Sequence, residues 1–102
     1  MVSLYITCKN CEEGEKIAEA IMSASAAGCI NMFPSSSIWR DEDGGIKRAE
    51  EMVLMVKTIE SKIPIIEEVV MAVGSYKAPC IASTNVDRIN REYKEWLGRT
   101  VG

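Results

Sequence analysis

The sequence contains no histidine, and this absence excludes several kinds of chemistry at once. Histidine is the commonest general base and the commonest side-chain ligand for transition metals. A catalytic triad that uses an imidazole and a metalloprotease of the HExxH type are therefore excluded. The seven glycines form neither a Walker loop nor a GxGxxG motif, so nucleotide binding through those loops is excluded as well.

Positive charge and long hydrophobic runs are also scarce. Lysine and arginine number 12 against 15 acidic residues, a net charge of −3, and no basic stripe typical of nucleic-acid-binding proteins is present. The longest apolar runs, residues 52–56 and 69–73, are far shorter than the roughly 20 residues of a membrane span. The N-terminus shows no basic and apolar signal segment. We expect a cytoplasmic protein that binds neither nucleic acid nor membrane.

What remains is the composition of one globular domain over residues 1–102, with 47% hydrophobic and 26% charged residues. A domain of this size buries only about two-thirds of the surface that its unfolded chain exposes. Association with further copies would add burial, so self-association is expected from the length alone.

The first half of the chain alternates between strand and helix patterns. Apolar and polar residues alternate over residues 2–8, which predicts a strand. Asn10 and Glu13 have the spacing of a capping box and begin a helix, which we expect to end at Gly28. A second strand then begins at Cys29.

The middle of the chain predicts a hairpin. The second strand is expected to bend or bulge at Pro34 and to resume at residues 38–39. Residues 40–45, RDEDGG, combine turn formers with charge and predict a solvent-exposed tip. A third strand follows over residues 47–58.

The last part of the chain repeats a helix and a strand. Apolar residues at helical spacing predict a helix over residues 63–73, with Ser61 as its cap and Gly74 as its end. A strand over residues 80–84 and a short helix capped by Asn90 complete the chain. The order is β-α-β-β-α-β with a C-terminal helix, which predicts an α+β, ferredoxin-like sandwich with two helices on one face of a four-stranded antiparallel sheet.

The third strand predicts that the other face of this sheet is covered too. Residues 52–56 are apolar at both alternating positions, whereas a sheet face in water carries polar side chains. The C-terminal helix is too short to cover four strands. We therefore expect further copies of the chain to supply the second layer, as a closed homo-oligomer.

The sharpest chemical signal is the CxxC sequence of Cys8 and Cys11 at the junction of the first strand and helix. Thioredoxin-like enzymes place a redox pair at such a junction, because a helix N-terminus lowers the pKa of a thiol. The topology argues against that fold, which needs a helix between its second and third strands. Two further interpretations stay open: two unrelated structural cysteines, or capture of a soft ion such as Cu(I) by thiolates.

Other candidate groups have a simpler structural interpretation. Cys29 and Cys80 lie among strand-like residues and are expected to be small core residues. We expect Met22, Met52, Met55 and Met71 to pack in the core and the acidic residues 41–43 to be a solvated turn. Four aromatic residues, most of them near the ends of predicted elements, suit interfaces or pockets: Trp39, Tyr76, Tyr93 and Trp96.

Several segments together resemble a known family. Residues 26–34, AAGCINMFP, resemble the AACVNIIPG segment of the CutA proteins, the divalent cation tolerance family. Four more segments resemble that family's SIW-type strand, EVLLLIKT, HPYEVPE and PEYLxWI segments in the same order: residues 37–39, 51–58, 76–79 and 92–97. The resemblance covers nearly the whole chain. It implies a ferredoxin-like fold, a tight homotrimer, and a shape similar to that of PII signalling proteins.

The sequence departs from the family pattern at two positions that the family associates with copper. The family's histidine before Pro-Tyr is absent, and residues 74–76 read Gly-Ser-Tyr. The glutamate after the later proline is replaced by Cys80. The usual copper(II) site is thus altered, and Cys80 suits a softer metal.

Three hypotheses on function follow. The first is a non-enzymatic homotrimer in metal-ion tolerance that binds copper or another divalent ion, with Cys8, Cys11 and Cys80 as candidate ligands. The second is a PII-like regulatory trimer that holds a small ligand between subunits. Its candidate lining residues are Trp39, Lys57, Tyr76 and Trp96. The third is a thiol oxidoreductase that uses the CxxC pair.

Overall fold

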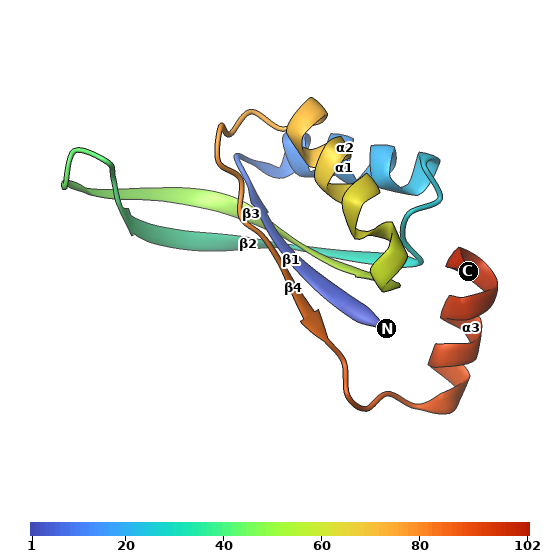
Figure 1. The fold of residues 1–102 in the computed structure, drawn as a ribbon. Coiled ribbons are helices and arrows are strands. Elements are labelled where there is room, and N and C mark those ends of the chain that lie inside the picture. The colour runs from blue at the N-terminus through green and yellow to red at the C-terminus, as the bar shows by residue number, and fades with distance from the viewer.

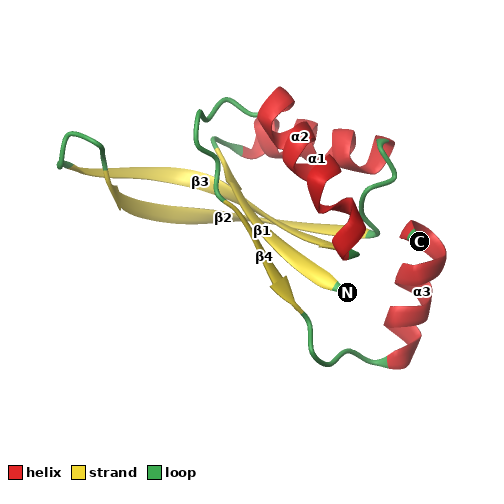
Figure 2. Cartoon of the chain, viewed as in Figure 1, coloured by secondary structure: helices red, strands yellow, loops and turns green.

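The structure is a computed structural model that describes all residues from 1 to 102. Its elements follow in the predicted order: β1 (Val2–Cys8), α1 (Cys11–Ser23), β2 (Cys29–Arg40), β3 (Ile46–Thr58), the short 3₁₀ turn η1 (Glu60–Lys62), α2 (Ile63–Val73), β4 (Ile81–Asn85) and α3 (Arg91–Val101). The four strands form one sheet in the order β2-β3-β1-β4, and every neighbouring pair is antiparallel. Helices α1 and α2 cover one face, and α3 lies apart at one end of the sheet (Figure 1; Figure 2). The ferredoxin-like α+β fold is confirmed.

The hydrophobic core lies between the sheet and the two helices. Leu4, Ile6, Leu54 and Val56 point from the sheet to this side, because residues two apart in a strand share a face. They pack with fully buried side chains from both helices, Ile17, Ile21, Ile66 and Val70. Burial of each such side chain contributes about 1.5–3 kcal/mol, so this layer is the main source of stability within one chain.

The start of α1 confirms Asn10 as the cap, whereas Glu13 accepts the amide of Lys9 and not that of Asn10, so only half of the capping box forms. The side chain of Asn10 accepts a hydrogen bond from the amide of Glu13 at 2.9 Å, which satisfies a free N–H group of the first turn. Gly14 then lets the helix approach the sheet closely. A Cβ atom there would lie 3.1 Å from Cγ of Met52 and 3.3 Å from Sγ of Cys8.

The end of α1 differs from the prediction, because the helix stops at Ser23 and not at Gly28. Ser25 takes the left-handed conformation, with φ of 53°, and its amide donates to the carbonyl of Met22. The amide of Ala26 donates to Ile21, which completes a Schellman motif without a glycine. Gly28 has a different use: a Cβ atom there would lie 2.5 Å from Cδ1 of Leu97, so the glycine makes room for α3.

Strand β2 is continuous, so the predicted bend or bulge at Pro34 is wrong. Pro34 pairs with Met52 in a register that runs unbroken from Cys29 to Arg40. Because β2 is an edge strand, half of its N–H positions face away from the sheet, and such a strand tolerates a proline.

Two predicted helix caps also differ. Ser61 lies inside η1, and Lys62 takes the N-cap position of α2 without a side-chain hydrogen bond. Asn90 is the N-cap residue of α3 as predicted, but its side-chain amide donates to Glu92 at 3.4 Å and makes no capping hydrogen bond. Gly74 ends α2 as predicted, with its amide bound to the carbonyl of Val70.

The β2–β3 hairpin extends well beyond the sheet (Figure 1). Strand β1 pairs with β3 only from Met52 onward, so residues 35–40 and 46–51 form an isolated two-stranded arm. The arm exposes three large apolar side chains: Ile38 at 56%, Trp39 at 42% and Ile46 at 62%. A two-stranded ribbon alone in water is only marginally stable.

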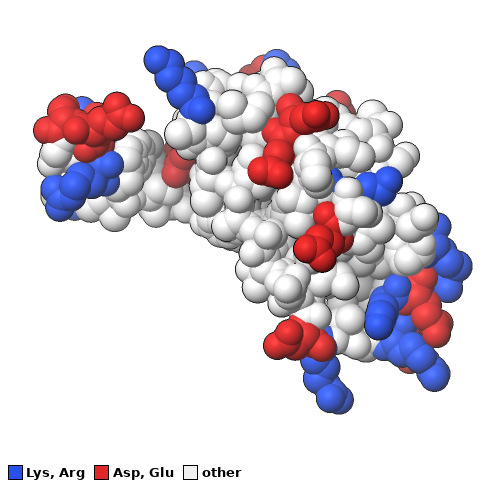
Figure 3. All heavy atoms as spheres, viewed as in Figure 1, with Lys and Arg blue, Asp and Glu red and all other residues white.

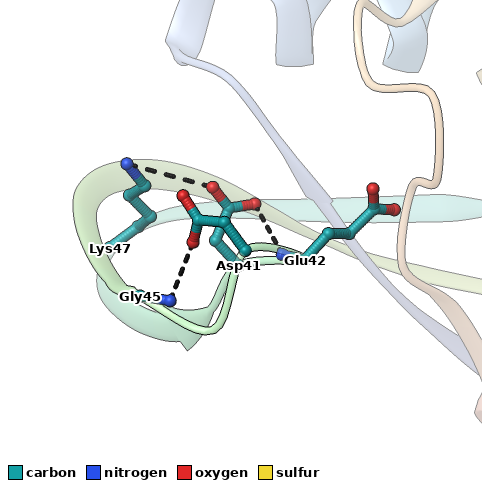
Figure 4. A network of polar contacts seen from close by, with 5 residues as sticks. Asp41, Glu42, Gly45 and Lys47 are labelled. Atoms are coloured by element: carbon teal, nitrogen blue, oxygen red, sulfur yellow. Dashed lines mark hydrogen bonds and ion pairs between the residues drawn. The ribbon is translucent and has the colours of Figure 1, made fainter.

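The tip of the arm is the solvated turn that its composition predicts (Figure 4). Its carboxylates bind groups of the turn itself. Asp41 accepts the amide of Glu42 at 3.0 Å and lies 3.9 Å from the ammonium of Lys47. Asp43 accepts the amide of Gly45 at 2.8 Å.

The prediction that the methionines pack in the core is wrong for Met22 and Met71, which are exposed on the helices at 42% and 56%.

Candidate functional site

The main cleft of the chain lies at the base of the arm and has a volume of about 690 Å³. It is bounded by the arm, by the end of β1 and by the loop between α2 and β4. Its lining residues are Thr7, Ser37, Ile38, Trp39, Asp41, Glu51, Ser75, Tyr76, Lys77, Ala78 and Cys80. The cleft therefore combines aromatic, hydroxyl, carboxylate and thiol groups in one place.

A hydrogen bond between Tyr76 and Glu51 joins the loop to the arm. The phenol of Tyr76 donates to Oε2 of Glu51 at 2.6 Å. Burial, this hydrogen bond and the negative charge of Glu51 raise the pKa of Tyr76 above its usual value. Tyr76 is therefore a neutral donor at physiological pH, and Glu51 keeps one oxygen for other partners.

Glu13 fixes the loop from the other side. Its Oε2 accepts the amide of Lys9 and its Oε1 accepts the amide of Ser75, both at 2.8 Å. Burial by itself would raise the pKa of Glu13, but the hydrogen bonds from these two residues outweigh it and hold the pKa below the usual value. The sequence indicated Glu13 only as a helix cap, because a bond to a residue 62 positions away leaves no local signal.

The CxxC pair is split between core and solvent. Cys8 is buried against α1, and its thiol lies 3.5 Å from the carbonyl of Met52. Burial, reinforced by the charges of Glu13 and Glu51, raises the pKa of Cys8 to about 11. Cys11 is exposed, and all four cysteines are free thiols. A redox nucleophile needs access and a lowered pKa, and Cys8 has neither.

The structure brings together only some of the predicted site residues. Trp39, Tyr76 and Cys80 line the same cleft, whereas Cys8 and Cys11 lie outside it. Cys80 is exposed, so its prediction as a core residue is wrong, and Cys29 is half-buried. No three Cys, Asp or Glu side chains of one chain gather to hold a metal ion.

Lys57 and Trp96 lie at the opposite end of the sheet from the arm. The ammonium of Lys57 donates to Oδ1 of Asn31 at 2.6 Å and lies 5.8 Å from the ring centre of Tyr93. Tyr93 in turn packs on Trp96 with ring centres 5.3 Å apart. Burial and the neighbouring thiol of Cys29 raise the pKa of Tyr93. Within one chain, the four predicted cleft residues thus form two separate groups.

The family of the chain follows from comparison with known proteins. Residues 2–100 match the family model described as CutA1 divalent ion tolerance protein. The chain belongs to the CutA1 divalent ion tolerance family. It is 36% identical over 98 residues to the divalent-cation tolerance protein CutA of Archaeoglobus fulgidus, covering 96% of this chain and 95% of that protein. The CutA protein of Thermus thermophilus is 34% identical, with 97% and 96% covered.

Solved structures agree with this assignment. The periplasmic divalent cation tolerance protein CutA from Archaeoglobus fulgidus superposes with a TM-score of 0.95 at 35% identity, covering all of both chains. The divalent cation tolerance protein from Thermus thermophilus gives 0.93 at 33% identity, again over both whole chains. The names of these CutA relatives describe cation tolerance and no catalytic activity. None of the helices in this chain has the length and apolar character that crossing a membrane requires.

Glu13 accepts hydrogen bonds from the amides of Lys9 and Ser75, and we call this pair of bonds the Glu13 clamp. The clamp predicts that the stability of the fold depends on pH. Because the pKa of Glu13 is lower in the folded chain than its usual value near 4.3, its contribution is fully present above that pH and is lost as the pH falls through the folded value. We expect Glu13→Gln to be less stable than the wild type at neutral pH, with the difference shrinking as the pH falls from neutral to below the usual carboxyl value. Urea unfolding across this pH range measures it.

The control for this prediction is Glu12→Gln, since Glu12 is exposed and forms only a 3.5 Å ion pair with Lys16. It should change stability little at any pH. Equal behaviour of the two variants would show that the clamp contributes nothing.

The split thiol pair predicts unequal reactivity. We expect iodoacetamide at pH 8 to modify Cys11 and Cys80 about tenfold or more faster than Cys8, because burial keeps Cys8 protonated and covered. Peptide mass spectrometry follows each cysteine separately, and the chain unfolded in guanidinium serves as the reference with all four accessible. Cys8 reacting first in the folded protein would restore the oxidoreductase hypothesis.

Proposed function

We propose that the chain acts in divalent-cation tolerance as a non-enzymatic homotrimer. The observation that carries this proposal is the uncovered apolar surface of the sheet and of the arm. Tyr5 and Phe33 lie on the face opposite α1 and α2, and they are exposed at 37% and 43%. Helix α3 reaches only the end of this face near Lys57. A single chain leaves the rest open to water.

Charge is unevenly distributed over the surface. In Figure 3 charged side chains gather at the arm tip and around α3, and several acidic and basic groups also lie on the body between them. Contacts between copies favour surfaces with little charge at their centre, and Tyr5 and Phe33 on the open sheet face are uncharged. A closed ring of copies would cover the sheet face and give each arm a surface to pack on. The number three is what the resemblance to the CutA family implies.

We propose that the protein binds a soft or divalent metal ion, and that copper is the first candidate. Cys11 and Cys80 are exposed thiols, and Cys8 would have to leave the core to take part. Since one chain offers no group of three ligands, a complete site would need donors from another copy. Thiolates favour Cu(I) over harder ions. The free thiols also agree with a reducing compartment, and we propose the cytoplasm.

A regulatory trimer that binds a small ligand is the second candidate, and the cleft favours it. Its volume of about 690 Å³ falls within the range of small-molecule sites, and it combines aromatic side chains with several polar groups. Trp39 and Tyr76 line it from one chain. Lys57 and Trp96 would have to come from a neighbouring copy.

The assembly proposal predicts that a charge on the open sheet face dissociates the trimer. Wild-type protein should have about three times the chain mass of 11.3 kDa in analytical ultracentrifugation. Phe33→Asp should shift it toward the monomer, because burial of a carboxylate at a subunit contact is unfavourable. Met71→Asp is the control, since Met71 is a similarly exposed apolar residue on α2. A folded wild-type monomer in dilute solution would refute the proposal.

The metal proposal predicts uptake that depends on Cys80. Calorimetry with Cu(I), Cu(II) and Zn(II) should show the strongest binding for Cu(I), and Cys80→Ser should weaken it by about tenfold or more. Cys29→Ser is the control, because Cys29 is half-buried beside Tyr93 and far from the cleft. No uptake of any of the three ions would reject direct metal binding.

A further inference from the structure

The sheet face opposite α1 and α2, which we call the open face, carries one charged residue near each end. Glu51 and Lys57 of β3 both point to this face, because residues an even number of positions apart in a strand share a side. Glu51 lies where the arm leaves the sheet, and Lys57 lies at the other end, near α3 (Figure 1). The side chains between them on the open face are uncharged: Val53, Met55, Phe33, Asn31, Tyr5 and Thr7.

Both charges are held in place by neutral groups of their own chain. Oε2 of Glu51 accepts the phenol of Tyr76 at 2.6 Å. The ammonium of Lys57 donates to Oδ1 of Asn31 at 2.6 Å and lies 5.8 Å from the ring centre of Tyr93. Neither charge takes part in an ion pair within the chain, although both residues are half-buried. A partly desolvated charge with only neutral contacts is stabilised by an opposite charge nearby.

One chain cannot bring these two charges together. Glu51 and Lys57 are six residues apart on one strand, which is about 20 Å at about 3.3 Å per residue. Lys77 lines the cleft beside Glu51, but it is exposed and forms no ion pair. An ionic partner for either residue would therefore have to come from another copy.

A closed ring of three copies supplies such a partner. Each contact in a ring joins two different surface patches, one from each copy. If the arm end of one open face meets the α3 end of the next, a negative end meets a positive end at every contact. Opposite charges at a contact fix its direction and disfavour other arrangements.

We infer that the copies pack head to tail, with the carboxylate of Glu51 paired with the ammonium of Lys57 from the next copy. The inference rests on the homotrimer of the proposed function and adds which ends of the chains meet. The cleft at the base of the arm then becomes a composite site, with its carboxylate from one copy and its ammonium from the next. The hydrogen bonds of Tyr76 and Asn31 orient the two groups beforehand, which lowers the conformational entropy lost on pairing.

Charge reversal at each position tests the pairing. Glu51→Lys and Lys57→Glu each put like charges at every contact. In analytical ultracentrifugation, each trimer should dissociate at a protein concentration about tenfold or more above that of the wild type. The double variant with both reversals restores opposite charges and should recover most of this loss.

Two control variants make the same charge changes away from the open face. Glu50→Lys changes the residue next to Glu51, whose neighbour Glu50 binds the hydroxyl of Ser36 instead. Lys16→Glu changes an exposed residue of α1. Both should assemble like the wild type.

The pairing and the trimer can fail separately. A wild-type trimer that both single reversals leave intact would overturn the pairing alone, and so would a loss that the double variant does not recover. Controls that dissociate as readily as the single reversals would overturn it too. A wild-type monomer would overturn the trimer and the pairing together.

Cross-linking of the wild type tests the same contact without a substitution. A carbodiimide joins a carboxylate to an amine only where the two groups touch. The trimer is assembled from equal amounts of unlabelled and isotope-labelled chains, and peptide mass spectrometry should find Glu51 of one kind joined to Lys57 of the other. A cross-linked trimer that lacks this link would contradict the head-to-tail pairing.

Discussion

The structure depends on how the two faces of strand β3 are removed from water. On one face, Leu54 and Val56 are fully buried under α1 and α2. On the other, Val53 is buried between its neighbours, but the surrounding Tyr5 and Phe33 face solvent. A central strand that is apolar on both sides is half of a larger core. The lone chain covers only one of the two sides, and the proposed assembly would cover the other.

The cleft owes its shape to two carboxylates that connect distant parts of the chain. Glu13 begins a helix and also holds the loop after α2, while Glu51 holds the same loop from the arm through Tyr76. The loop is thereby fixed between the core and the protruding hairpin. Because both bonds involve a charged acceptor, they are stronger than neutral hydrogen bonds. The same contacts that build the fold therefore arrange the groups that face the cleft.

The order of elements could be predicted from the sequence because it is written in local periodicity and turn residues. The errors arose where the structure departs from the usual local preference. Ser25 ends α1, although a glycine such as Gly28 is the usual residue at that position. Pro34 lies in a regular strand, because β2 is an edge strand. The site was harder to predict. Aromatic residues at element ends indicated Trp39 and Tyr76, but the part of Glu51 depends on a pairing across 25 residues that no motif records. Lys57 and Trp96 were predicted to line the same cleft, but the fold places them at the opposite end of the sheet. Such tertiary placement leaves no local pattern in the sequence.

The exposed arm also affects how readily a newly synthesised chain aggregates. In the single chain, the outer strand of the arm presents unpaired backbone groups beside apolar side chains, and such a ribbon can pair with another extended segment. In the proposed trimer, correct assembly and aggregation would compete for this surface, and the rates of both would rise with the concentration of the chain.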